Sequence, residues 1–146
     1  MRIRGQVSID LMFAVVLILI TALGVISWGN NQKAETATFG NAAYVKVFAV
    51  DIRDSVAKVY AHGPGFEVVK EPPFPMSEGD WVNVSLNTNG TLVVVANLGG
   101  LEYRVVQRLQ VPVAVPSHVL LTPENRTLVI KAVRLESGGV GVVLGP

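Results

Sequence analysis

The sequence contains no cysteine, which excludes disulfide bonds and thiolate metal sites. It has only two histidines, His62 and His118, and neither stands at a metal-ligand spacing from another ligand. With 12 Lys and Arg against 11 Asp and Glu, the net charge is +1, and no basic stripe of the kind that binds nucleic acid is present. The sequence also lacks a phosphate-binding glycine loop and a nucleophile elbow. These absences argue against an enzyme, a cofactor and a nucleic-acid partner.

Apolar residues are what the chain has in excess. They make up 50% of its 146 residues, and the mean hydropathy is +0.46. A chain of this length accommodates one domain with its own core beside an N-terminal anchor, but not two ordinary domains. Part of the apolar excess is local and lies near the start of the chain, and the rest follows position 66 as many Val and Leu residues.

The first apolar stretch predicts a helix that is not stable in contact with water. Residues 11–26 read LMFAVVLILITALGVI, carry no charge and include Thr21 as their only polar side chain. A bilayer span needs about 20 mostly apolar residues, and the segment from Val7 to Trp28 is just long enough. Arg2 and Arg4 precede the run, and positive residues favour the cytoplasmic side, so we expect the N-terminus inside and the remainder outside.

Three ordinary interpretations of this helix fit less well. A secretory signal peptide would need a small-x-small cleavage site, and residues 27–33 read SWGNNQK. A plain signal anchor leaves Asp10 unexplained, because a carboxylate within a membrane segment is costly and tends to be functional. A buried core helix is disfavoured because the run is apolar on all sides.

The residues before the helix carry a more specific pattern. Residues 4–10 read Arg-Gly-Gln-Val-Ser-Ile-Asp and run directly into the apolar stretch. This resembles the class III signal peptide of archaeal type IV pilins, which is a basic residue, Gly, and then Gln-x-Ser-x-acid before an apolar helix. The resemblance covers seven residues, and it departs from the pattern in having Asp rather than Glu at the acidic position. The residues that match the processing signal are Arg4, Gly5, Gln6 and Ser8.

The resemblance implies a sequence of events. A membrane-embedded prepilin peptidase would cleave between Gly5 and Gln6, so that residues 1–5 are the signal peptide and the apolar helix over residues 6–28 is kept. An assembly ATPase and a membrane platform protein would then move this helix from the membrane into a filament of pilin subunits. The resemblance also implies a pilin-like fold, in which a long N-terminal helix packs against a C-terminal head.

Asp10 has a physical role in this scheme. Cleavage would expose an α-amine on Gln6, and an uncompensated carboxylate in an apolar environment is expensive. An amine from a neighbouring subunit would offset that cost, and the helix macrodipole favours negative charge in the first turns. We therefore expect Asp10 to act in assembly, by pairing with an amine or by setting subunit register.

The helical pattern continues as an amphipathic segment over residues 29–62. Large apolar residues recur there at spacings of three and four, which predicts a packing face: Tyr44, Val45, Phe48, Ile52, Val56, Val59 and Tyr60. Gly63-Pro64-Gly65 is expected to end the helix. Gly and Asn residues weaken the pattern near residues 29–31, where we expect a bend or a frayed turn.

Residues 63–146 predict an antiparallel β head, which makes the fold α+β. Short runs rich in Val and Leu are separated by turn signals, and we predict strands near residues 66–70, 80–86, 91–97, 101–109, 117–121, 127–135 and 139–144. Asn89-Gly90 and Gly99-Gly100 are expected to form hairpin turns. Pro112 and Pro116 indicate an edge or a bulge. The run of residues 92–95 is apolar on both faces and predicts a central strand. One sheet covering the packing face would account for the pattern.

The predicted head also carries candidate modification and cation sites. Asn83, Asn89 and Asn125 each begin an N-x-Ser/Thr sequon and are candidate N-glycosylation sites, with Asn89 at a predicted hairpin tip. Glu78 and Asp80 flank a glycine and could contribute to a cation site, although a solvated turn is the simpler interpretation.

The sequence thus predicts a structural subunit of an archaeal type IV pilus that serves adhesion, with other copies of the pilin as its main partners. An archaellin fits less well, since that related family usually lacks the Gln-x-Ser-x-acid signature and tends to have a larger head. The alternative from another class is a minor pilin or a membrane-anchored extracellular binding or accessory protein with the same processing signal. A secreted enzyme held by an anchor would need catalytic residues that the sequence does not offer.

Overall fold

The structure is a computed structural model. It describes the backbone of residues 3–146 and the side chains of Ile9, residues 11–28 and residues 40–146. The chain divides into two compact units, Met1–Gly40 and Asn41–Pro146. The coarse prediction of an α+β chain with an N-terminal apolar helix and antiparallel strands is confirmed.

The only helix of the described chain is α1, Ile3–His62. Its backbone is helical through residues 29–31, so the frayed turn expected there is not found. The predicted end is confirmed: Gly63 follows the last helical residue with a φ of 86°. The Gly63 N–H donates to the carbonyls of Val59 and Tyr60, both at 3.2 Å, which satisfies groups that a helix end would otherwise leave free.

Seven strands follow the helix, and each predicted strand is confirmed to within one residue at either end. They are β1 (Glu67–Lys70), β2 (Trp81–Asn87), β3 (Thr91–Leu98), β4 (Leu101–Arg108), β5 (Ser117–Leu121), β6 (Leu128–Arg134) and β7 (Val140–Gly145). The connection between β3 and β4 is a two-residue loop in which Gly99 and Gly100 have φ angles of 61° and 79°. A loop with two positive φ angles favours glycine, which explains why the Gly-Gly signal predicted this hairpin.

The strands form two sheets, so the expectation of a single sheet was wrong. One sheet has the order β4-β3-β2-β5 and the other has the order β1-β6-β7, and all of their ladders are antiparallel. The predicted central strand is confirmed, because β3 lies between β4 and β2. Its side chains at 92 and 94 are buried, while those at 93 and 95 point to the opposite face and are half-buried.

The two sheets meet where the segment before β5 crosses the edge of β7. Val113 forms a single parallel bridge with Val142 there, and the Leu144 N–H donates to the Ser117 hydroxyl at 3.0 Å. A Cβ on Gly141 would lie 2.8 Å from the Ala114 Cβ, so the crossing depends on the glycine. Prolines at 112 and 116 lack an N–H and interrupt a ladder on this edge. The backbone joins the two sheets through this one bridge and not through a ladder, so the seven strands form two sheets.

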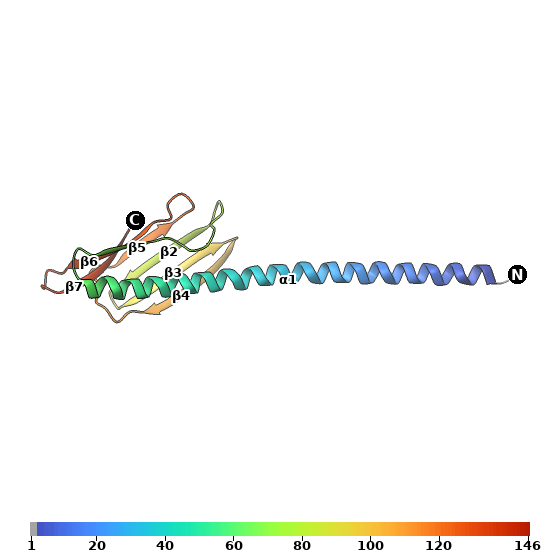
Figure 1. Ribbon diagram of the computed structural model, residues 1–146, viewed down its shortest axis with the longest axis horizontal. Coiled ribbons are helices and arrows are strands. Elements are labelled where there is room, and N and C mark those ends of the chain that lie inside the picture. Colours follow the sequence, from blue (N-terminus) through green and yellow to red (C-terminus); the bar gives the residue numbers. More distant parts are fainter. Residues whose placement is uncertain (1–2) are drawn as a thin grey trace. The chain divides into compact units, whose positions relative to one another are not determined.

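The core of the second unit lies between the C-terminal part of α1 and the strands, which Figure 1 shows beside it. Five residues of the predicted packing face have no exposed surface: Val45, Phe48, Ile52, Val56 and Val59. They belong to one buried cluster with inward-facing side chains of β2, β3, β5, β6 and β7. Tyr60 packs at the border of this cluster. Tyr44 differs from the prediction, because it is 50% exposed and contacts only the rim, where its ring centroid is 6.4 Å from that of Phe74.

We expect Phe48→Ala to lower the free energy of unfolding of residues 41–146 by about 3–5 kcal/mol, because it leaves a cavity in the closed core. The matched control is Val47→Ala, at a helix position that is 61% exposed, where the change should stay within about 0.5 kcal/mol. Urea unfolding followed by the fluorescence of Trp81, the only tryptophan in this segment, measures both. Equal effects of the two substitutions would contradict the assigned packing.

Candidate functional site

The N-terminal part of α1 presents an apolar surface that nothing in the described chain covers. The segment Leu11–Trp28 has a mean hydropathy of 2.6, none of it is buried, and it is long and apolar enough to cross a membrane. Its large apolar side chains are between 48% (Val15) and 68% (Trp28) exposed. The one hydroxyl, on Thr21, donates to the Leu17 carbonyl at 2.8 Å and is satisfied within the helix. The segment therefore needs no polar partner and offers apolar surface on every side.

The size of this surface decides what the segment can do. Burial of one large aliphatic side chain is worth about 1.5–3 kcal/mol, and the segment leaves more than ten such side chains exposed. A helix that is apolar all round is stable in a membrane or in the interior of a larger assembly. Residues 45–59 of the same helix, in contrast, face their own sheets and are covered. The apolar surface of residues 11–28 has no cover among the described residues.

The predicted processing and assembly residues lie next to this surface along the chain. The backbone is helical at Arg4, Gly5, Gln6, Ser8 and Asp10. Their side chains lie outside the part that the structure describes, so the signal that they form stays a prediction from the sequence.

The three sequon asparagines occupy different surroundings. Asn83 is half-buried within β2, and its Oδ1 lies 3.5 Å from the Ser85 hydroxyl. Asn89 is exposed in the turn between β2 and β3, where its Oδ1 accepts a hydrogen bond from the Thr91 N–H at 3.1 Å. Asn125 is exposed in the connection between β5 and β6. Asn89 and Asn125 are therefore more accessible for glycosylation than Asn83.

The acidic pair at 78 and 80 does not build a cation site. Both carboxylate oxygens of Asp80 accept backbone hydrogen bonds, from the Ser77 N–H at 2.7 Å and from the Gly99 N–H at 2.8 Å. Asp80 therefore ties its loop to the β3–β4 hairpin, and Glu78 stays exposed beside it. Among the described side chains, no group of three His, Cys, Asp or Glu is placed to hold a metal ion.

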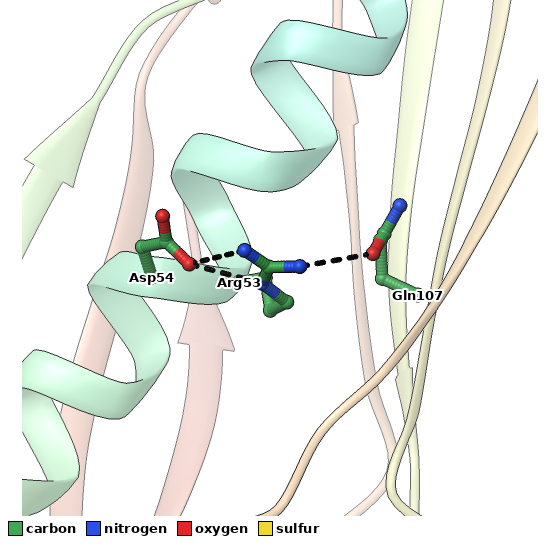
Figure 2. Close-up of polar contacts among 3 residues, drawn as sticks. All are labelled: Arg53, Asp54 and Gln107. Atoms are coloured by element: carbon green, nitrogen blue, oxygen red, sulfur yellow. Dashed lines mark hydrogen bonds and ion pairs between the residues drawn. The ribbon is translucent and has the colours of Figure 1, made fainter.

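An arginine connects α1 to the four-stranded sheet. The Arg53 Nε and Nη2 donate to the Asp54 Oδ1 at 2.9 and 2.8 Å, and Nη1 reaches the Gln107 Oε1 of β4 at 3.5 Å (Figure 2). The Arg53 and Asp54 side chains are 40% and 62% exposed, so this ion pair is worth about 0–1 kcal/mol. A hollow of about 300 Å³ lies against these residues and Arg108. The Arg53–Asp54 pair satisfies its own charges, and we assign it a role in positioning the helix.

Sequence reasoning missed the part played by the proline-rich loop of residues 71–75. Phe74 is almost fully buried, and its ring packs edge-on against that of Phe48 with centroids 6.0 Å apart. The Arg126 Nη2 donates to the carbonyls of Pro72 and Phe74, at 2.8 and 2.9 Å, and holds the loop in place. A phenylalanine flanked by prolines was the available signal, because a stiff loop can hold an aromatic side chain in a core.

Comparisons with protein families, with curated proteins and with solved structures found no match. The arrangement is a folded head joined to an apolar helix segment that is not covered within the described chain.

Proposed function

We propose that this protein is a structural subunit of an archaeal type IV pilus and acts by assembly into a surface filament that serves adhesion. One observation carries the proposal: a single helix has a part whose apolar face is buried in the head and a part, Leu11–Trp28, whose apolar surface is exposed all round. A membrane covers such a segment while the chain is a monomer. Neighbouring copies of the same helix cover it once a filament forms.

The processing signal supplies the order of these two states. A prepilin peptidase cleaves between Gly5 and Gln6 on the cytoplasmic side and leaves the apolar helix attached to the head. The head then lies outside the cell, and an assembly ATPase with a membrane platform protein transfers the helix from the bilayer to the filament core. This order rests on the resemblance of residues 4–10 to a class III signal peptide.

We expect the mature protein in purified surface filaments to begin at Gln6. A bulky residue at the cleavage position, as in Gly5→Val, should leave the full-length chain in the membrane and abolish filaments, whereas Thr21→Ala within the apolar segment should change neither property. N-terminal sequencing and electron microscopy of sheared filaments measure these outcomes. A mature start beyond residue 28 would show an ordinary secreted protein, and a chain present only in traces in the filaments would show an accessory subunit.

Asp10 should be needed for assembly but not for membrane insertion. A carboxylate that pairs with the α-amine of a neighbouring copy loses that partner in Asp10→Ala, while the substitution makes the segment a better membrane span. We therefore expect Asp10→Ala to accumulate as processed protein in membranes without filaments, and Asp10→Glu to assemble. Filament yield per cell, measured by immunoblot of sheared material, is the readout, and normal assembly of Asp10→Ala would refute this role.

We further propose that the exposed head carries N-linked glycan, with Asn89 as the main site because it is exposed in a turn. The intact mass of the mature chain should exceed the polypeptide mass, and Asn89→Gln should remove most of the excess. Asn83→Gln, in the middle of β2, serves as the control and should leave the mass excess in place. An intact mass equal to that of the polypeptide alone would rule out glycosylation.

A further inference from the structure

The four-stranded sheet has an outer face that no element of the described chain covers. Along its strands the side chains alternate, so that Val82, Val84 and their neighbours on β3 point into the core. The opposite face carries partly or largely exposed apolar residues, among them Val106 on β4 and Leu120 on β5, which are 54% and 52% exposed. Because β4 and β5 form the two edges of this sheet, these residues lie at opposite sides of one surface.

The outer face of β4 carries Glu102, Arg104, Val106 and Arg108, and we call the last three of these the basic edge. Arg104 and Val106 are in register with Val95 and Val93, and Arg108 follows at the end of the strand, where it also lines the hollow beside Arg53 and Asp54. Both arginines are exposed and form no ion pair or hydrogen bond with any side chain that the structure describes. The strand itself has no further neighbour in its sheet, so its second side is open.

The opposite side of the face is acidic and hollowed, and we call Glu78, Trp81, Leu120 and Glu124 the acidic hollow. These residues line a surface hollow of about 710 Å³ at the end of β5. The Asp80 carboxylate is occupied by two backbone N–H groups, which leaves Glu78 and Glu124 as exposed carboxylates with no partner among the described side chains. Trp81 is half-buried and lines the same hollow.

The two surfaces are complementary in chemistry. The basic edge presents guanidinium groups on either side of a valine, and the acidic hollow presents carboxylates around an aromatic ring and a leucine. A guanidinium placed over an indole face is attracted by the ring, and nearby carboxylates strengthen the attraction by charge. Val106 on β4 and Leu120 on β5 lie three strand spacings apart, or about 14 Å at ~4.8 Å per strand.

We propose that the basic edge of one copy docks into the acidic hollow of the next, with Arg104 over Trp81 and Val106 against Leu120. The proposal rests on the filament function proposed above and names a contact that holds neighbouring heads together. Two different surfaces can also pair reciprocally in a closed dimer, so the heterologous form, which extends into an open filament, follows from the proposed filament function and not from the surfaces themselves. Asn83 lies between the two surfaces, in register with Val95 and Leu120, and is expected to carry no glycan.

Disulfide cross-linking tests this contact directly, because the chain contains no cysteine of its own. The full chain with Val106→Cys and Leu120→Cys together should yield, under mild oxidation of filaments and of membranes, a ladder of multimers that thiol reduction collapses to monomer. Each single variant should stay monomeric. The matched control pairs Leu120→Cys with Val69→Cys, which is 56% exposed on β1 of the other sheet, and should give no ladder.

Charge reversal provides the second test. Arg104→Glu in the double-cysteine chain should reduce the ladder about tenfold, because like charges would then meet in the hollow, and adding Glu78→Arg should restore it.

Filaments without a ladder would overturn the contact and leave the filament function standing. A single cross-linked dimer band would show a closed dimer, and a ladder insensitive to both reversals would show a different contact, so each of these results overturns the proposal. A ladder in membranes of a chain that makes no filaments would support the contact and refute the filament function.

Discussion

The cost of leaving apolar side chains in water determines how this chain is built. The apolar side chains of residues 45–59 of α1 are removed from water within the chain, because they pack against two sheets and the buried Phe74. The segment Leu11–Trp28 has no such cover. One helix therefore carries two apolar surfaces, a face that is buried in the head and a segment that is exposed among the described residues. We propose that lipid or other copies cover this segment.

The head is constructed so that its own core does not depend on the segment. Its sheets meet through the close approach of Ala114 to Gly141, and the Arg126 guanidinium holds the proline-rich loop that supplies Phe74 to the core. These contacts join parts of the chain that are far apart in sequence. The basic edge and the acidic hollow lie at the two sides of the four-stranded sheet, where contacts with neighbouring heads are proposed to form.

Much of the secondary structure could be predicted from the sequence, because local signals determine it. Gly63 ends the helix and Gly99-Gly100 turns a hairpin for conformational reasons that involve only a few residues. The division into two sheets could not be predicted in this way, since it depends on how the segment around Pro112 crosses β7, a contact between distant residues. For the same reason the burial of Phe74 and the exposure of Tyr44 were missed. The candidate processing signal shows the reverse situation: residues 4–10 match the pattern in sequence, but the side chains of Arg4, Gly5, Gln6, Ser8 and Asp10 lie outside the described part.

We propose that the surface of Leu11–Trp28 is covered by the membrane first and by neighbouring copies afterwards. The absence of native cysteines allows a direct measurement with a water-soluble, membrane-impermeant maleimide on Leu17→Cys, compared with Thr88→Cys in an exposed turn of the head. We expect the thiol at 17 to stay unmodified in intact membranes and in purified filaments and to react only after denaturation, while the thiol at 88 reacts in both. Ready modification at position 17 in filaments would contradict it.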